Sequence, residues 1–359
     1  MSSPLSICLI ASARFPVGEP FAGGLEAHTH MLAAELIRRG HRVTLFAGPG
    51  SDAALGVTEL PVSTFRVSSP DHGMLGAAPD EWMREHHAYL GLLLDLAGSA
   101  DTRFDVVHNN SLHYLPVAMA GSLPVPMVTT LHTPPLPWLE SAVAVSPASC
   151  TFVAVSDFTA SSWATVTRAE TILNGVDTDW WRPGPGGAEA VWSGRIVPEK
   201  APHLAVEAAR LAGVPIRLAG PVLDRAYFDR EVAGLLGEDA TYLGHLAKAA
   251  LRDLVGTARV ALVTPDWDEP YGLVAAEAMS CGTPVAAFAR GALPEIIGAT
   301  SGRLAPPGDV EALASALGEA ARLDRREVRG VALEHFSMSR MVDEYESLYR
   351  VLSGSGAAA

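Results

Sequence analysis

The stretch that most constrains the fold is DEPYGLVAAEAMSCGTPV, residues 268–285. Apolar runs at 260–263 before it and at 285–288 after it are typical of buried strands. Residues 272–280 between the runs have helical propensity, and the sequence CGTP that follows is a stop signal for a helix. The segment therefore predicts a strand, a loop, a short helix and a second strand.

Two glutamates stand at the two ends of this predicted junction. Glu269 lies in the loop, because the proline after it is tolerated only outside a helix or in its first turn. Glu277 lies about two turns along the helix. The main-chain N–H groups of Gly272, Leu273 and Val274 have no partner inside the helix, which suits an anion. Taken alone, Glu277 is better explained as a solvated residue on the helix face, and Glu269 as an ordinary loop acid near a helix dipole that favours it.

Together with the Pro-Tyr-Gly between the glutamates, the stretch resembles the E-x7-E motif of retaining family 4 glycosyltransferases, which have the GT-B fold. The resemblance implies an α/β protein with two Rossmann-like, doubly wound parallel-sheet domains facing a cleft. We expect an N-terminal, acceptor-side domain at 1–180 and a C-terminal, nucleotide-sugar-binding domain at 181–336. A C-terminal helix at 337–352 is expected to pack back toward the first domain, and 353–359 to be a disordered tail.

Length and composition limit the other possibilities. The 359 residues suggest two domains, and 48% hydrophobic content indicates a globular chain. The net charge of −14 argues against a nonspecific nucleic-acid binder and against stable association with an anionic membrane. Three cysteines form neither a metal-binding spacing nor a disulfide framework. The N-terminus lacks the basic start of a signal peptide, so a cytoplasmic enzyme is expected.

The first half of the chain alternates strand and helix patterns. Strands are expected at 5–11, 41–48, 65–68, 104–108, 126–132 and 151–156, with the clearest helices at 25–39 and 80–97. This alternation predicts a parallel, doubly wound sheet that binds ligands at the carboxyl ends of its strands.

Two features of the first half bear on a donor site. The glycine pair Gly23 and Gly24 precedes a helix, where a backbone can approach a phosphate, although a tight turn is the better explanation of the pair taken alone. Its spacing differs from the dinucleotide fingerprint, which argues against a nicotinamide enzyme. His132 ends a predicted strand. The resemblance implies that the glycines contact the donor diphosphate and that His132 contacts the donor sugar, although Pro134 replaces the family's usual acid.

The second half carries the basic residues of interest. Of 26 basic residues only Lys200 and Lys248 are lysines. An arginine can hold phosphate oxygens with two hydrogen bonds and a lysine adds a mobile charge, although exposed basic residues in loops are usually solvated. Arg195 and Lys200 have the spacing of the family's G-R-x-x-x-x-K loop, which implies diphosphate contacts. The same resemblance gives Glu295 a structural role.

The resemblance implies a retaining hexosyltransferase. It would move a hexose, expected to be glucose, from a UDP-sugar to a small or soluble hydroxyl acceptor. The expected catalytic residues are Glu269, His132, Arg195 and Lys200. We see no Asp-x-Asp loop that would bind a divalent metal, so neither a metal nor a cofactor is expected. The expected donor-binding residues are Gly23, Gly24, Arg195, Lys200, Leu246 (beside the base), Glu269, Tyr271, Gly272, Leu273, Val274 and Glu277 (on the ribose).

Other functions remain open for this sequence. One alternative is a nucleotide-sugar 2-epimerase, which would need further acids or histidines in the site. Another is a catalytically silent protein that binds a sugar nucleotide without transferring the sugar. A lipid acceptor is not expected, because the helical segment 79–98 carries four acids against the single Arg84.

Overall fold

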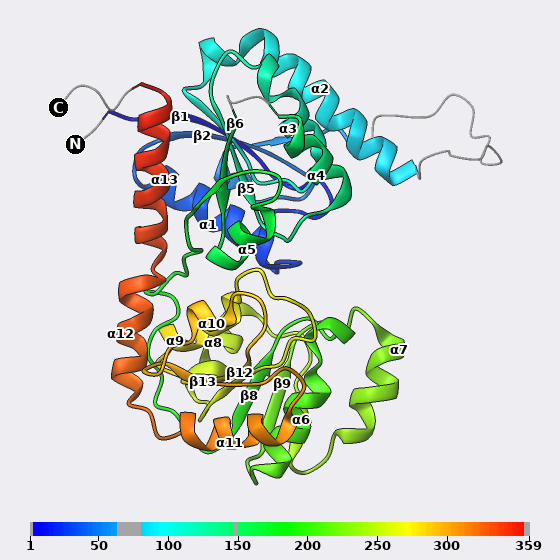
Figure 1. The fold of residues 1–359 in the computed structure, drawn as a ribbon, viewed down its shortest axis with the longest axis vertical. Helices are drawn as coiled ribbons and strands as arrows, with labels where there is room; N and C mark the ends of the chain where they lie inside the picture. Colours follow the sequence, from blue (N-terminus) through cyan, green and yellow to red (C-terminus); the bar gives the residue numbers. More distant parts are fainter. Residues whose placement is uncertain (1–2, 63–79, 147–149, 355–359) are drawn as a thin grey trace. The chain divides into compact units, whose positions relative to one another are not determined.

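The structure is a computed structural model of the 359-residue chain, and it describes residues 3–62, 80–146 and 150–354. The chain divides into two compact units (Figure 1). Unit 1 comprises Met1–Val155, Thr159–Ile172 and Val342–Ala359, and unit 2 comprises Ser156–Phe158 and Leu173–Met341.

Unit 1 is built on a seven-stranded sheet in the order β3-β2-β1-β4-β5-β6-β7, in which every pair is parallel. Its strands are β1 (Ser6–Ile10), β2 (Arg42–Ala47), β3 (Val57–Glu59), β4 (Val106–Asn109), β5 (Met127–Leu131), β6 (Cys150–Ala154) and β7 (Ala169–Thr171). The strand order reverses between the neighbours β1 and β4. In such sheets ligands bind outside the carboxyl ends at this reversal.

The helices of unit 1 bury apolar faces on this sheet. They are α1 (Gly24–Arg38), α2 (Asp80–Arg103), α3 (Tyr114–Met119), α4 (Pro137–Ala144), the end of α5 (Asp157–Trp163) and the end of α13 (Met338–Leu352). On α2, Ala88, Leu92 and Leu96 recur at helical spacing and join the core with Val107 of β4. Helix α3 packs against both α2 and α4 (Figure 1).

Unit 2 repeats the design with a six-stranded parallel sheet in the order β10-β9-β8-β11-β12-β13. Its strands are β8 (Ala190–Ser193), β9 (Ile216–Ala219), β10 (Ala240–Tyr242), β11 (Ala261–Val263), β12 (Val285–Phe288) and β13 (Gly302–Ala305). Its helices include α6 (Pro202–Leu211), α8 (Lys248–Gly256), α9 (Leu273–Ser280), α10 (Leu293–Ile296), α11 (Val310–Ala320) and α12 (Arg325–His335). Here the order reverses between β8 and β11.

The two parallel α/β sheets confirm the predicted fold class. The segment 225–236, whose composition predicts a helix, is helical but irregular: it forms a single α-helical turn, α7 (Arg225–Tyr227), and continues as wider π-helical turns at Phe228–Val232 and a 3₁₀ turn at Ala233–Leu235. The predicted strand at 65–68 and the end of the predicted tail lie outside the described residues. Among the helices that the structure describes, none is long and apolar enough to cross a membrane.

The terminal helix α13 is joined to the sheet of unit 1 by buried polar contacts. The hydroxyl of Tyr349 lies 2.6 Å from His108 Nδ1, and His108 Nε2 lies 2.7 Å from Thr130 Oγ1. Tyr345 hydrogen-bonds to the same Thr130 hydroxyl at 2.9 Å. Burial lowers the pKa of His108, so this histidine is neutral at pH 7.

Candidate active site

The candidate site in unit 2 begins where β11 leads into α9. Gly272 caps the helix with a φ of 104°, a left-handed conformation that favours glycine. A Cβ at this position would lie 2.6 Å from Leu293 Cδ2. Within the described parts of the chain, the amides of Gly272, Leu273 and Val274 donate to no acceptor. The helix start therefore presents free N–H groups, as the sequence predicts.

Lys200 and Glu269, separated by 69 residues in the sequence, meet at this edge. The ammonium Nζ lies 2.5 Å from the carboxylate Oε2, and the two side chains are only 21% and 14% exposed. Trp267 donates its Nε1–H to the same oxygen at 3.0 Å, and its ring centroid lies 5.2 Å from the ammonium. Because the pair is largely shielded from solvent, salt screens it less than a surface pair.

The loop that carries Lys200 is fixed to the neighbouring strand. Thr264, just after β11, places its hydroxyl 3.2 Å from the carbonyl of Lys200 and 3.0 Å from that of Ala201. Trp192 donates its indole N–H to the same hydroxyl at 3.1 Å. Ala201 has a φ of 41°, which a non-glycine residue adopts only at a cost in free energy. The surrounding contacts thus hold a strained backbone next to Lys200.

The backbone of Glu269 is fixed by the loop after β12. Ala292 donates its N–H to the carbonyl of Glu269 at 2.8 Å. Gly291 has a φ of 58°, and a Cβ there would lie 2.2 Å from the same carbonyl oxygen. Arg290 forms ion pairs with Asp266 and Asp268 on the exposed side of this loop. These contacts leave the Glu269 main chain little freedom.

Arg195 follows the end of β8, and its side chain has no partner among the described residues. Its side chain is half-buried, and no hydrogen bond or ion pair reaches it from the residues that the structure describes. Gly194 before it donates its N–H to Ala219 at 3.0 Å, and Gly220 packs so closely that a Cβ would lie 1.7 Å from the Gly194 carbonyl oxygen. The structure does not bring Arg195 into contact with Lys200, with which the sequence groups it.

Glu277 lies in α9, and the charge of Lys248, the second lysine of the chain, affects its pKa. Burial raises the pKa of Glu277 to about 8, and the positive charge of Lys248 acts in the opposite direction. Lys248 begins α8, and its ammonium lies 5.2 Å from the ring centroid of Trp180. Arg252, one turn later, lies 5.0 Å from the same ring. Leu246 is half-buried in the loop just before α8.

Two further residues that the sequence singles out make contacts within unit 2. Tyr271 is 3% exposed and donates its hydroxyl hydrogen to the carbonyl of Asn174 at 2.5 Å. This hydroxyl is therefore engaged inside unit 2. The carboxylate of Glu295 accepts hydrogen bonds from the amides of Asp157 at 2.8 Å and Phe158 at 2.5 Å, which confirms its predicted structural role.

In unit 1, His132 follows β5 as predicted. Its Nε2–H donates to Asn110 Oδ1 at 2.9 Å, and its ring packs edge-on against His28 with the centroids 4.9 Å apart. Burial, with the nearby His28 and His108, lowers the pKa of His132, so the ring is neutral at pH 7. Since Nε2 carries the proton, Nδ1 is the acceptor atom of this ring.

The glycine pair lies at the start of α1. Gly23 is the N-cap in an extended conformation, and Gly24 is the first helical residue. A Cβ at Gly23 would lie 3.4 Å from Glu26 Oε2, which is an ordinary contact. The chain itself therefore does not require a glycine at position 23.

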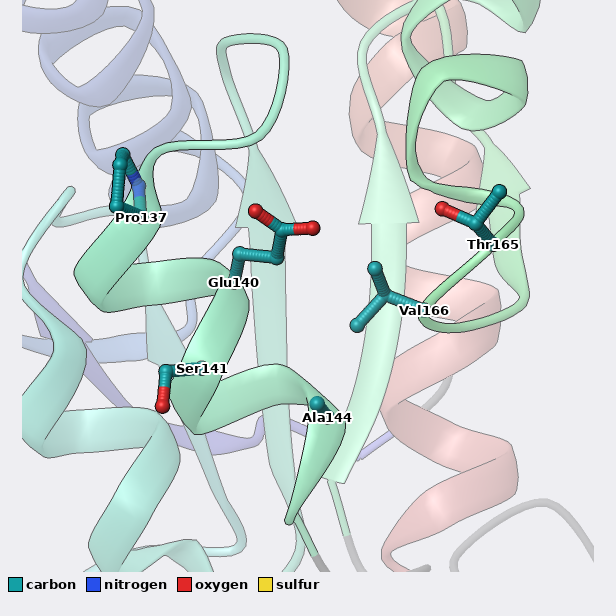
Figure 2. A pocket seen from close by; sticks show the side chains of 6 residues that line it. All are labelled: Pro137, Glu140, Ser141, Ala144, Thr165 and Val166. Atoms are coloured by element: carbon teal, nitrogen blue, oxygen red, sulfur yellow. The ribbon is translucent and has the colours of Figure 1, made fainter.

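No predicted site residue lines the open hollow of about 470 Å³ in unit 1 (Figure 2). Figure 2 shows this hollow between α4, which carries Glu140, and the turn at Thr165 and Val166. Among the described residues, no group of three or more histidines, cysteines or acids is arranged to hold a metal.

Sequence reasoning missed three participants. Trp267 donates a hydrogen bond to Glu269, and its position two residues before Glu269 could have indicated this contact. Lys248 stood out only as one of two lysines, and its effect on Glu277 depends on the packing of α8 near α9. Asn110 comes directly after a buried strand, where a polar side chain indicates a ligand edge.

The chain was compared with known proteins. Residues 22–180 match the family model Glycosyltransferase Family 4, and residues 185–329 match the model Glycosyl transferases group 1. A D-inositol 3-phosphate glycosyltransferase of Gordonia bronchialis is 30% identical over 99% of this chain and 90% of that protein. A glycogen synthase of Mycobacterium tuberculosis is 30% identical over 82% of this chain and 81% of its own.

A solved structure shares the fold. The Anabaena protein HepE, determined in complex with UDP and glucose, aligns with a TM-score of 0.73 and 17% identity over 96% of this chain and 99% of that chain. The two parallel-sheet units and this likeness show a GT-B fold. Taken with the two family models and the relatives above, they show that the chain belongs to the family 4 type of glycosyltransferases.

Proposed function

We propose that the protein is a retaining hexosyltransferase that moves glucose from UDP-glucose to a hydroxyl acceptor. The observation that carries the proposal is the cluster of Lys200, Glu269 and Trp267 at the edge where α9 presents free amides. Cationic and N–H donors suit a diphosphate, and a carboxylate beside them suits sugar hydroxyls. The UDP and glucose bound by the Anabaena relative support the choice of donor.

The basic residues would stabilise the leaving group. Negative charge grows on the diphosphate as the bond from the sugar carbon C1 to the phosphate oxygen breaks, and fixed donors lower that barrier. An ammonium has three N–H donors, so the contact of Lys200 with Glu269 leaves two for phosphate oxygens. Arg195, which has no partner among the described residues, supplies a second cation. These groups support a reaction that proceeds without a divalent metal.

Glu269 and His132 would hold the sugar. One oxygen of Glu269 accepts from both Lys200 and Trp267, which leaves the other oxygen for sugar hydroxyls. Neutral His132 offers Nδ1 as an acceptor for another hydroxyl. Glu277 would bind the ribose hydroxyls.

Retention follows in this scheme from attack on the face that the diphosphate leaves. The acceptor oxygen bonds to C1 on that face, and its proton passes to the departing phosphate oxygen. The scheme needs no covalent nucleophile from the chain, and electrons and protons balance between the acceptor and the diphosphate.

The test is a donor panel of UDP-glucose, ADP-glucose and GDP-mannose, with nucleotide release as the readout. We expect release from UDP-glucose above all, persisting in excess EDTA, and a product whose anomeric configuration by NMR matches that of the donor. Preference for another donor would overturn the assignment of the sugar nucleotide. Inversion, or loss of activity that magnesium restores, would overturn the retaining or the metal-independent part.

A further inference from the structure

Aromatic rings from three helices of unit 1 gather in one place, which we call the aromatic patch: Trp82, His86, His113, Tyr114 and Trp138. Trp82 and His86, one turn apart on α2, stack with centroids 5.2 Å apart. Tyr114 lies 6.3 Å from Trp82 at an interplanar angle of 14°, and 6.0 Å from Trp138. Trp138 is 68% exposed, so the patch reaches the surface.

The patch is anchored where the strand order of the sheet reverses. The Tyr89 hydroxyl donates to the carbonyl of Ala11 and accepts from the amide of Ala13, both at 2.8 Å, and these residues follow β1. His113 lies four residues after β4 and stacks on Tyr89 with centroids 4.6 Å apart. Because β1 and β4 flank the reversal, the patch adjoins the edge at which such sheets bind ligands.

Buried polar atoms whose hydrogen bonding is incomplete belong to the patch and to the residues next to it. His113 Nδ1 accepts from the amide of Leu115 at 3.2 Å, so the neutral ring carries its proton on Nε2. This Nε2 and Nδ2 of Asn110 are buried and have no hydrogen-bond partner among the described residues, and the buried Oε1 of Glu85 has only an ion pair with Arg14 at 3.6 Å. Asn110 is 0% exposed. Hydroxyl groups both donate and accept, so a polyhydroxylated ligand could satisfy all three atoms.

The charges around the patch favour a neutral ligand. Acids outnumber arginines on the surrounding segments, with Asp80, Glu81 and Glu85 on α2 and Glu140 on α4 against Arg14 and Arg84. Arg14 is moreover paired with Glu85 at 3.6 Å. A phosphate or carboxylate would be repelled here. Imidazoles between the larger rings also make the patch too polar for a lipid chain.

We propose that the aromatic patch binds the acceptor of the reaction, a neutral sugar whose ring lies on Trp82 and Trp138 and whose hydroxyls bond to His113 and Glu85. The apolar C–H face of a sugar ring suits an aromatic face, and the donors and acceptors at its edge suit the hydroxyls. This inference rests on the proposed function, because it makes one sugar hydroxyl the attacking group.

Saccharide binding by the full chain tests the patch directly. Ligand-observed NMR with maltose, lactose, sucrose and methyl mannoside would be measured on the wild type, Trp82→Ala and Trp138→Ala. The matched control is Leu94→Ala, which removes a side chain that is 60% exposed on α2 outside the patch. We expect at least one of these sugars to bind the wild type and the control, and to bind the tryptophan variants roughly three- to tenfold more weakly.

Three outcomes would overturn the inference: no sugar of the panel binds, the tryptophan variants bind as well as Leu94→Ala, or glucose 6-phosphate binds better than the neutral sugars. Donor chemistry is measured separately, by UDP calorimetry and by UDP release from UDP-glucose without acceptor. Failure of those two measurements counts against the proposed function and leaves the saccharide result standing. With a bound sugar as acceptor, Trp138→Ala should raise the acceptor KM and leave UDP affinity unchanged.

Discussion

Lys200 and Glu269 form an ion pair of 2.5 Å that the indole N–H of Trp267 extends at 3.0 Å. The pair joins a loop after β8 to a loop after β11, the two strands at which the sheet of unit 2 reverses its order. Removing one partner leaves the other charge in a largely buried place without compensation. The effects of substituting the two residues should therefore be coupled and not additive.

The first prediction concerns Lys200. Lys200→Ala should lower kcat/KM about tenfold to a hundredfold, because a charge-assisted contact to the diphosphate is lost. This factor corresponds to a loss of roughly 1.5–3 kcal/mol in transition-state stabilisation. Steady-state kinetics with UDP-glucose give the measurement. Arg225→Ala is the control, since it removes an equal charge from an exposed pair with Asp229. Wild-type kinetics in a folded Lys200→Ala variant would mean that this lysine does not bind the leaving group.

The second prediction concerns the pH dependence of UDP binding. Free Glu277 has its pKa raised to about 8 by burial, so it is largely protonated at pH 7. If its carboxylate binds the ribose, UDP favours the ionised form, lowers this pKa and releases a proton. UDP affinity should then rise as pH increases toward about 8 and level off above it.

Calorimetry in two buffers of different ionisation enthalpy detects the released proton. Glu277→Gln keeps the shape of the side chain and cannot ionise, so its UDP affinity should be weaker and flat across the same pH range. An equal pH dependence in Glu277→Gln would assign the titration to another group.

The sequence predicted the helices and strands more readily than the contacts between elements that are distant in the chain. Apolar runs and glycine stops located the strands and helices around α9 because those signals are local. The contact of Lys200 with Glu269 depends on β8 lying beside β11, which is a property of strand order and not of either segment. The aromatic patch likewise needs α2, α3 and α4 to meet, and nothing local to Trp82 or Trp138 indicates it.

Side-chain roles were predicted less well than positions. Tyr271 lies between the two glutamates as the motif requires, yet its hydroxyl bonds to Asn174 in the core. The segment at 225–236 has helical composition, but tertiary packing of Phe228 and Val232 accompanies wider turns than an α-helix has. In both cases the deciding contacts come from distant parts of the chain.

The third prediction concerns Gly291, whose positive φ and close approach support Glu269. Gly291→Ala should force the loop away from the Glu269 carbonyl, because the new Cβ would lie 2.2 Å from that oxygen. We expect a loss of stability of more than about 1 kcal/mol and a clear fall in kcat. Thermal unfolding and UDP-release kinetics measure the two effects.

Gly298→Ala is the matched control, since a Cβ there meets nothing within 4 Å. If the two variants had the same thermal stability and the same kcat, the close approach of Gly291 would not be what positions Glu269.

The last prediction concerns the contact between α13 and the sheet of unit 1. Tyr349 is 0% exposed, and its hydroxyl lies 2.6 Å from Nδ1 of the equally buried His108. Tyr349→Phe removes that hydroxyl and leaves a buried ring nitrogen without its partner, which should cost about 1–3 kcal/mol of unfolding free energy. Urea denaturation followed by circular dichroism measures the loss. Val351→Ala, at a position 70% exposed on the same helix, should change the stability by less than about 0.5 kcal/mol. Equal stabilities for the two variants would show that the hydroxyl contributes nothing, and that α13 is held on unit 1 by apolar packing and by the pairing of Glu346 with Arg39 and His41.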